Sequence, residues 1–181
     1  MSVSSWLEHN KSKGGDILSN VIVNNIYDKL VEDRIIFIRG EINNATVSEV
    51  VANLLYLDLI SNDDITIYIN SPGGLVTGGL MIYDTIKYLK SDVSTVGIGL
   101  SASIAGIILA SGTKGKRKIL PHGKVVFHEI STDTSGKLTD ILLAIKEAKK
   151  TNDILLDIIA KNSVIKKSEL KQRLTTDFYM D

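Results

Sequence analysis

This chain of 181 residues contains no cysteine, so serine is the side chain to consider as a catalytic nucleophile. Only three histidines are present to act as its base. A serine hydroxyl becomes a useful nucleophile when a neighbouring base, usually histidine, takes its proton. Two serines, Ser101 and Ser103, lie in a glycine-rich stretch (residues 97–106) where a strand is expected to meet a helix. Such a junction can expose a nucleophilic hydroxyl in front of a helix N-terminus. The strict Gly-x-Ser-x-Gly pattern is absent, so spacing does not choose between the two serines, and small residues that let a helix approach a sheet explain the stretch equally well.

The candidate base is one of three histidines. His128 directly follows an expected strand, residues 124–127, and a strand can hold an imidazole rigidly at a sheet edge. His122 lies in a turn-like Leu-Pro-His-Gly segment, and His9 lies in a polar N-terminal segment. His128 is therefore the best placed of the three, but a lone histidine at a strand end is more often structural, so its position alone does not assign it a catalytic role. His122 and His128 have no convincing third ligand, so no metal site is predicted.

A second glycine-rich turn, Ser71-Pro72-Gly73-Gly74, follows the expected strand at residues 65–69. Adjacent glycines can adopt unusual backbone angles and leave their N–H groups uncovered, which suits the binding of an anion or an oxyanion. The same residues also suit an ordinary tight turn between a strand and a helix. Their spacing alone does not separate these two interpretations.

Gly97-x-Gly99-x-x-Ala102 also fits the loose fingerprint of a dinucleotide-binding turn. However, no acidic residue lies about 20 positions further on to bind a ribose, and the preceding strand is not the first of the chain. A dinucleotide-dependent oxidoreductase therefore ranks last among the functions considered.

The composition indicates one globular domain, with 44% apolar and 23% charged residues. The 21 basic residues are balanced by 21 acidic ones, so the basic excess typical of nucleic-acid binding is missing. The absence of cysteine excludes disulfides and thiolate chemistry, and a cytoplasmic location is expected. Residues 93–113 carry no charge, but about half of them are Gly, Ser or Thr, so no membrane span is predicted.

Apolar runs and helical spacings alternate along the chain, which predicts an α/β fold with helices covering a sheet. Strands are expected at residues 35–38, 65–69, 93–98 and 124–127, and helices at residues 48–60, 80–89 and 103–110. Ser48 and Glu49 suit the start of the first of these helices. The basic cluster at residues 114–118 is interpreted as a solvated turn, and residues 1–25 as a flexible extension.

A long helix is predicted at residues 137–162. One largely apolar stripe recurs along it at three- and four-residue steps, formed by Leu138, Ile141, Leu142, Ile145, Ala148, Asn152, Leu155 and Ile159. At 1.5 Å per residue the helix would be about 37 Å long, more than a domain of this size needs to cover itself. We therefore expect it to protrude and to pack on another subunit of a homo-oligomer.

Several spaced segments resemble, in order, the proteolytic subunit family of the Clp protease (ClpP). They are Tyr68-Ile-Asn-Ser-Pro-Gly-Gly74, Ile82-Tyr-Asp-Thr85, Asp92-Val-Ser-Thr95, Ala102-Ser103, Gly112-Thr-Lys-Gly-Lys-Arg117, Leu120-Pro121 and His128. The resemblance extends from about Ile26 to Asp181, which sets residues 26–181 as the protease domain. It implies a crotonase-like α/β spiral of repeated β-β-α units, in which residues 137–162 form the protruding handle helix.

Carried over residue by residue, the resemblance implies a serine endopeptidase with Ser103 as nucleophile, His128 as base and Asp177 as the acid. The oxyanion hole would be formed by the backbone N–H groups of Gly74 and Ile104. No cofactor is implied for this chain, since ATP would be used by a partner unfoldase.

The resemblance also implies partners. The chain would form heptameric rings that stack in pairs as a tetradecamer, an AAA+ unfoldase would supply unfolded protein substrates, and neither nucleic acid nor membrane would be bound. Two alternatives remain: a weak or inactive ring subunit with a regulatory role, and a crotonase-fold enzyme acting on an acyl-CoA. The chain departs from the family pattern at Glu129-Ile130, where Gln-Pro is typical, and at Thr175-Thr176, where charged residues are typical.

Overall fold

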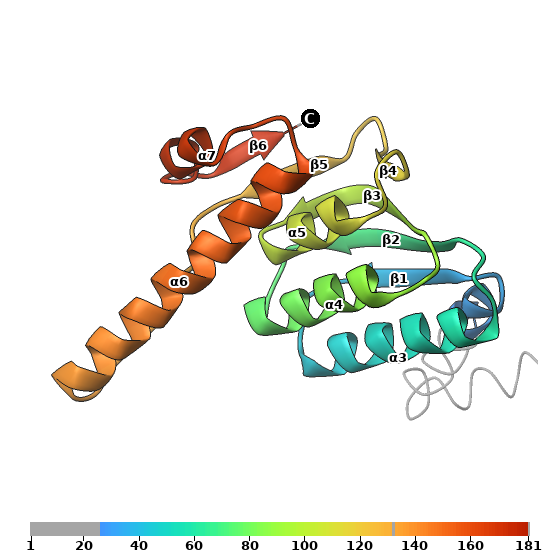
Figure 1. Cartoon of the computed structure of the whole chain (residues 1–181), viewed down its shortest axis with the longest axis horizontal. Helices are drawn as coiled ribbons and strands as arrows, with labels where there is room; N and C mark the ends of the chain where they lie inside the picture. The colour runs from blue at the N-terminus through green and yellow to red at the C-terminus, as the bar shows by residue number, and fades with distance from the viewer. Residues whose placement is uncertain (1–25, 132, 181) are drawn as a thin grey trace, which may run out of the picture.

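The computed structural model describes residues 26–131 and 133–180, which form a sheet with helices packed against it (Figure 1). The strand order is β1-β2-β3-β5-β6, and β4 pairs with β3 beside β5. All neighbouring strands run parallel except β6, which is antiparallel to β5. The strands are β1 (Ile35–Arg39), β2 (Ile65–Ser71), β3 (Val93–Ala102), β4 (Arg117–Ile119), β5 (Lys124–Phe127) and β6 (Phe178–Met180).

Three helices lie side by side against one face of this sheet: α3 (Asn44–Ile60), α4 (Val76–Tyr88) and α5 (Ile104–Ser111) (Figure 1). They follow β1, β2 and β3 respectively, as expected for parallel strands joined by helical crossovers. The helix α6 (Leu138–Asn162) packs on α5 with one end and projects past the sheet with the other, and α7 (Lys167–Arg173) packs on α6. The predicted α/β fold with a long protruding helix is confirmed.

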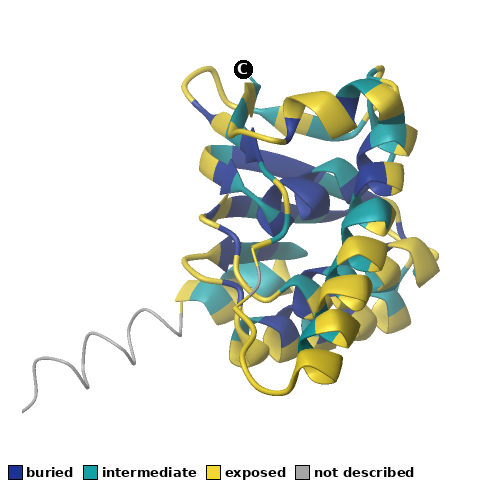
Figure 2. Cartoon of the chain, turned by 90° about the vertical axis from the view of Figure 1, so that its left-hand side faces the viewer, coloured by how far each residue is buried: buried dark blue, intermediate teal, exposed yellow. Residues whose placement is uncertain are grey.

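The core lies between the sheet and the three helices, where buried residues are concentrated (Figure 2). Alternate residues of the central strands point into it, as the two-residue period of a strand requires. The buried strand residues include Ile36 and Ile38 of β1 and Ile65, Ile67 and Ile69 of β2. The strands therefore form a rigid base whose carboxyl ends carry the loops described below.

Two helices begin earlier than the sequence predicted. In α3 the start lies at Asn44 instead of Ser48, because the Asn43 side chain caps the helix by accepting a hydrogen bond from the Thr46 N–H at 3.1 Å. In α4 the start lies at Val76 instead of Leu80. Its first turns contain Gly79, where a Cβ atom would collide with the Ile104 side chain, so the glycine permits close packing of α4 on α5.

The predicted strand at residues 93–98 continues to Ala102 as β3. The extension pairs with both neighbours, since Ser101 lies opposite Ser71 of β2 and Ala102 lies opposite Val126 of β5. Gly97 and Gly99 therefore lie inside the strand and not in a turn, which removes the geometric basis for the dinucleotide fingerprint. The uncharged stretch at residues 93–113 is divided between β3 and α5, and none of the helices in the described residues has the length and apolar character needed to cross a membrane.

The apolar stripe of α6 has two different environments. Toward the C-terminal end, Ile159 of the stripe is buried against the rest of the chain, together with the neighbouring Leu156 and Ile158. Toward the projecting N-terminal end, Leu138 and Leu142 are 70% and 58% exposed. Only the N-terminal part of the stripe is therefore free in the isolated chain to pack on another subunit.

The basic cluster at residues 114–118 is only partly a solvated turn. Lys116 forms ion pairs with Asp64 and Asp92, at 2.6 and 2.9 Å. Arg117 begins β4, and its guanidinium donates a hydrogen bond of 2.7 Å to the Asn162 carbonyl at the end of α6. The prediction of a turn missed these contacts because their partners are distant in the sequence.

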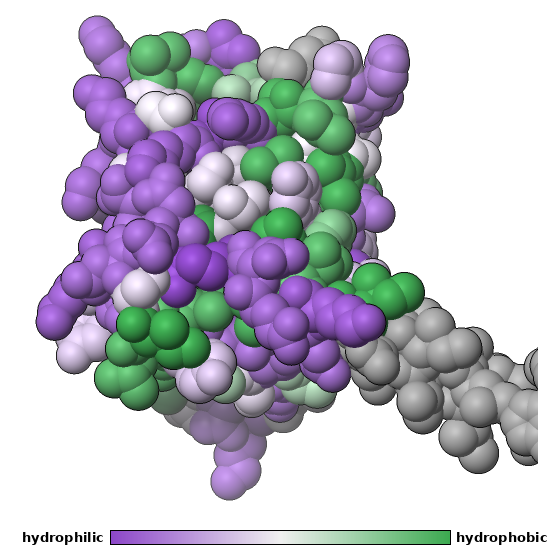
Figure 3. Space-filling view, turned by 90° about the vertical axis from the view of Figure 1, so that its right-hand side faces the viewer, coloured by the Kyte–Doolittle hydropathy of each residue, from purple (hydrophilic) through white to green (hydrophobic). Residues whose placement is uncertain are grey.

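Exposed apolar side chains also occur near the C-terminal ends of α3 and α4, at Leu59, Ile60 and Tyr88. Figure 3 shows the side of the molecule where these two helices end, and apolar patches interrupt a largely hydrophilic surface there. These patches are separate from the exposed apolar residues of α6.

Candidate active site

Ser103 occupies the sharp corner between β3 and α5. Its backbone has φ 55° and ψ −126°, a left-handed conformation that is uncommon for any residue other than glycine. The corner is held by two hydrogen bonds: the Ser103 N–H donates to the Val126 carbonyl at 2.7 Å, and its carbonyl accepts from the Gly106 N–H at 3.0 Å. Such strain, worth about 1–3 kcal/mol, is typical of functional positions. The arrangement matches a nucleophile at a strand-to-helix turn.

Two glycines leave the space that this corner needs. A Cβ atom on Gly73 would lie 2.8 Å from the Cβ of Ser103, and one on Gly106 would lie 2.7 Å from the Phe127 ring. Neither glycine belongs to a Gly-x-Ser-x-Gly pattern, because Gly73 comes from the loop after β2. The space around Ser103 is therefore provided by the loop after β2 and by α5.

The loop after β2 lies against the Ser103 corner at Gly73. The same loop is fixed on its other side by a short β-bridge to Ile42. The Ile42 N–H donates to the Gly73 carbonyl at 2.8 Å, and the Leu75 N–H donates to the Ile42 carbonyl at 2.7 Å. These two hydrogen bonds use the Gly73 carbonyl and the Leu75 N–H, the groups on either side of Gly74. The N–H of Gly74 itself has no backbone acceptor in the described part of the chain. Ile104 is the first residue of α5, where N–H groups have no partner within the helix. The two N–H groups assigned to an oxyanion hole are thus available as donors.

His128 directly follows β5 and is half-buried. Its Nδ1 atom lies 2.6 Å from the carbonyl oxygen of Glu129. Because a carbonyl oxygen only accepts hydrogen bonds, Nδ1 must carry the proton in this contact. The neutral imidazole then has its lone pair on Nε2, the tautomer that a general base for serine requires.

Asp177 immediately precedes β6 and is exposed. The antiparallel pairing of β5 and β6 ends with Phe127 opposite Phe178, so His128 and Asp177 are the residues just beyond the last pair of the two strands. The carboxylate does not line the pocket that holds Ser103 and His128. The strand pairing thus brings the backbones of Asp177 and His128 to the same end of the β5–β6 pair, while the contact at Nδ1 is made by the Glu129 carbonyl.

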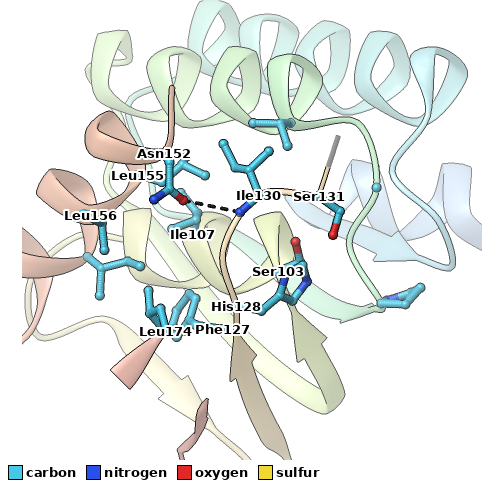
Figure 4. Close-up of a pocket in the computed structure, with 14 residues that line it drawn as sticks. Ser103, Ile107, Phe127, His128, Ile130, Ser131, Asn152, Leu155, Leu156 and Leu174 are labelled. Carbon is cyan, nitrogen blue, oxygen red and sulfur yellow. Dashed lines mark hydrogen bonds between the residues drawn. The ribbon is translucent and has the colours of Figure 1, made fainter. Parts of the chain in front are cut away.

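A pocket of about 240 Å³ opens beside Ser103 and His128 (Figure 4). Gly74 and Pro72 of the loop after β2 form part of its wall. Apolar side chains form most of the remainder: Val76, Ile107, Phe127, Ile130, Leu155, Leu156, Ile159 and Leu174. The pocket is suited to an uncharged side chain presented next to the Ser103 hydroxyl.

Asn152 is a polar residue of this pocket that the sequence did not single out as functional. Its side-chain oxygen accepts a hydrogen bond from the Ile130 N–H at 3.3 Å, shown as the dashed line in Figure 4. In the sequence, the one feature that could have indicated a role for Asn152 was that it is the only polar residue in the apolar stripe of the long helix. That signal was insufficient, because the partner is a backbone group 22 positions earlier.

Ser101 is excluded from the pocket by burial. Its side chain points into the protein, the residue is 1% exposed, and its hydroxyl has no hydrogen-bond partner among the described residues. Since β3 continues through this position, Ser101 and Ser103 lie on either side of the strand's last residue and in different surroundings. The structure therefore distinguishes the two serines that spacing left equivalent.

Ion pairs hold α7 against α6 behind the pocket. Lys167 contacts Asp153 at 2.8 Å and Asp157 at 2.7 Å, and Lys171 contacts Asp153 at 3.0 Å. Hydrogen bonds from the two lysines lower the pKa of Asp153, and those to the two aspartates raise the pKa of Lys167. This clamp positions the segment that leads from α7 to Asp177.

Comparison with known families agrees with this architecture. The family described as Clp protease matches residues 19–181. The chain belongs to the Clp protease family, and the resemblance noted in the sequence is confirmed.

Proposed function

We propose that this protein is a serine endopeptidase in which Ser103 is the nucleophile and His128 is the general base. The observation that carries the proposal is that Ser103, in its strained corner, lines one apolar pocket together with His128 and Gly74. Membership of a peptidase family supports the same reaction class.

In the proposed reaction, His128 Nε2 takes the Ser103 proton as the serine oxygen attacks the carbonyl carbon of a peptide bond. The N–H groups of Gly74 and Ile104 stabilise the negative oxygen of the tetrahedral intermediate. His128 then gives the proton to the leaving amine, and the acyl-enzyme is hydrolysed by a water molecule activated in the same way. The pocket would hold an uncharged side chain of the substrate.

Asp177 is the proposed acid of the site. Asp177 and His128 directly adjoin the last pair of β6 and β5, Phe178 and Phe127, which supports this role. A nearby carboxylate favours the positive imidazolium that forms when His128 takes the proton. No cofactor is needed for these steps.

We further propose that the chain works in a ring assembly fed with unfolded protein by an AAA+ unfoldase, as its family membership suggests. The exposed apolar residues of α6 support its role as a contact between subunits, with two heptameric rings stacked through these helices. A ring enclosing the sites would restrict hydrolysis to chains that can be threaded inside.

A second candidate is a weakly active or inactive ring subunit. It is favoured by the contact of His128 Nδ1 with a neutral carbonyl and by the exposure of Asp177. A neutral acceptor stabilises an imidazolium less than a carboxylate does.

The two candidates are separated by hydrolysis of a short fluorogenic peptide, with Ser103→Ala as control. Small peptides do not require an unfoldase. Turnover that is lost in Ser103→Ala supports the endopeptidase. Absence of turnover and of fluorophosphonate labelling in a folded, assembled wild-type protein would favour the inactive subunit.

A further inference from the structure

The peptide group between Glu129 and Ile130 is held from both sides. On one side its carbonyl oxygen, which belongs to Glu129, contacts His128 Nδ1 at 2.6 Å. On the other side its N–H, which belongs to Ile130, donates to Asn152 Oδ1 at 3.3 Å. Because the C=O and N–H of a trans peptide group point in opposite directions, a partner that fixes the N–H also aims the carbonyl.

We propose that Asn152 is a positioning residue that acts on His128 through this peptide group. The inference rests on the proposed function, in which His128 is the base. By accepting the Ile130 N–H, the Asn152 side chain directs the Glu129 carbonyl at the imidazole. The carbonyl then keeps the proton on Nδ1 and leaves the lone pair on Nε2, in the pocket that Ser103 also lines.

The surroundings of Asn152 make this hydrogen bond important. Asn152 projects from α6 into a pocket whose other walls are mainly apolar, including Leu155, Leu156 and Ile107 (Figure 4). A polar group in such surroundings carries a desolvation cost unless it is hydrogen-bonded. The Ile130 N–H offers the matching donor, so each group satisfies the other.

The other end of the segment is also fixed, which leaves the peptide group little freedom. The Glu129 N–H donates to the Leu174 carbonyl at 3.2 Å, next to the C-terminal end of α7. The ion-paired clamp of Lys167 and Asp153 holds α7 on α6, the helix that also carries Asn152. The packed helices α6 and α7 therefore fix the positions of both acceptors, Asn152 Oδ1 and the Leu174 carbonyl. The orientation of the imidazole then depends on α6 as well as on β5.

In this proposal two different groups select the histidine tautomer and stabilise the imidazolium. In the standard arrangement the acid both selects the tautomer and stabilises the imidazolium. Here the Glu129 carbonyl, positioned by Asn152, selects the tautomer, and Asp177 contributes its charge alone.

The test compares variants of the full chain that alter only the acceptor at residue 152. Asn152→Leu keeps the size of the side chain and removes the acceptor, while Asn152→Asp keeps an acceptor oxygen. Thr151→Val is the matched control, because it also replaces a polar side chain on α6, and within the described residues the Thr151 hydroxyl donates only to the Glu147 carbonyl. Each variant is measured for kcat and KM on a fluorogenic peptide and for the rate of fluorophosphonate labelling of Ser103, with melting curves to verify folding.

We expect Asn152→Leu to lower kcat about tenfold, the effect of one lost hydrogen bond, with KM changed by less than about twofold. Labelling should slow to the same extent, although the probe does not occupy the peptide-binding pocket as a substrate does. Asn152→Asp should keep at least about half of the wild-type kcat, and Thr151→Val should be unchanged. Unchanged kcat and labelling in Asn152→Leu, or equal impairment of Asn152→Asp, would overturn the proposal.

A double-mutant cycle tests the hydrogen bond between Asn152 and Ile130 by also removing its donor. Proline lacks an N–H, so Ile130→Pro removes the donor that Asn152 accepts. In the Ile130→Pro background, Asn152→Leu should then have no further effect on kcat, whereas a full additional loss would contradict the link. An inert folded wild type would overturn the proposed function itself, and this inference with it, whereas an active wild type with an insensitive Asn152 would overturn only the inference.

Discussion

His128 Nδ1 lies 2.6 Å from the carbonyl oxygen of Glu129, the residue that directly follows it in the chain. The imidazole is therefore oriented by the backbone of its own segment, while Asp177 lies immediately before β6, the strand that pairs with β5. This local contact is the reason why the contribution of each group can be separated by mutation.

Asp177→Asn should reduce kcat, because the charge that favours the imidazolium is lost. The reduction should be well below the loss of about 10⁴ that follows when a carboxylate alone selects the tautomer, since the Glu129 carbonyl still holds Nδ1. Steady-state kinetics on a fluorogenic peptide measure the effect, with Asp133→Asn as a control at another exposed aspartate. A loss of 10⁴ would show that Asp177 itself orients His128.

Ser101→Ala should keep most of the peptidase activity, because Ser101 is buried outside the pocket. It should also leave the protein as stable as the wild type or more stable by about 1 kcal/mol, since the Ser101 hydroxyl has no partner among the described residues. Thermal melting and peptide hydrolysis check both statements. Loss of activity in Ser101→Ala with activity retained in Ser103→Ala would reverse the assignment of the nucleophile.

Leu142→Glu should decrease the mass of the native assembly. Leu142 is 58% exposed on the projecting part of α6, so a charge there would disturb a contact between subunits without entering the core of the chain. Leu155 is less suitable for this test, because it lines the pocket of its own chain. Sedimentation velocity measures the mass, and Lys146→Glu serves as control at an exposed polar position of α6. An unchanged assembly in a folded Leu142→Glu variant would argue against α6 as an interface.

Lys167→Met should lower the melting temperature slightly at neutral pH, because it removes both ion pairs to Asp153 and Asp157. The pKa of Asp153 is lowered from 3.8, so its contribution to stability is complete above 3.8 and is lost as the pH falls through the lowered value. The pKa of Lys167 is raised from 10.5, so its contribution is complete below 10.5 and is lost as the pH rises through the raised value.

The difference in melting temperature between the wild type and Lys167→Met should therefore be constant from about pH 5 to pH 9 and should shrink in strong acid. It should also decrease in 1 M salt, where charges on the surface are screened within about 3 Å. Lys150→Met is the control, because Lys150 is more exposed and lies 3.9 Å from Glu147. A difference that persists unchanged in strong acid would show that Lys167 stabilises through its aliphatic chain instead.

The sequence by itself determined the class of fold and the main candidates for the site. Apolar runs such as β5 and the three- and four-residue spacing of α6 are local patterns, so the strand and the helix were predicted nearly to the residue. The spaced motifs around Ser103 and His128 likewise indicated the family that the comparison confirmed.

Contacts between residues distant in the sequence were decided only by the tertiary structure. The strand pairing of Ser101 with Ser71 extended β3 past its glycines and separated Ser101 from Ser103, which no local pattern could do. The link from Asn152 through Ile130 to His128 depends on the direction of one peptide group, and that direction is set by where α6 packs. The tendency of a segment to form a helix or a strand depends on residues that are close in the sequence. The hydrogen-bond geometry at a site depends instead on how helices and strands distant in the sequence pack together.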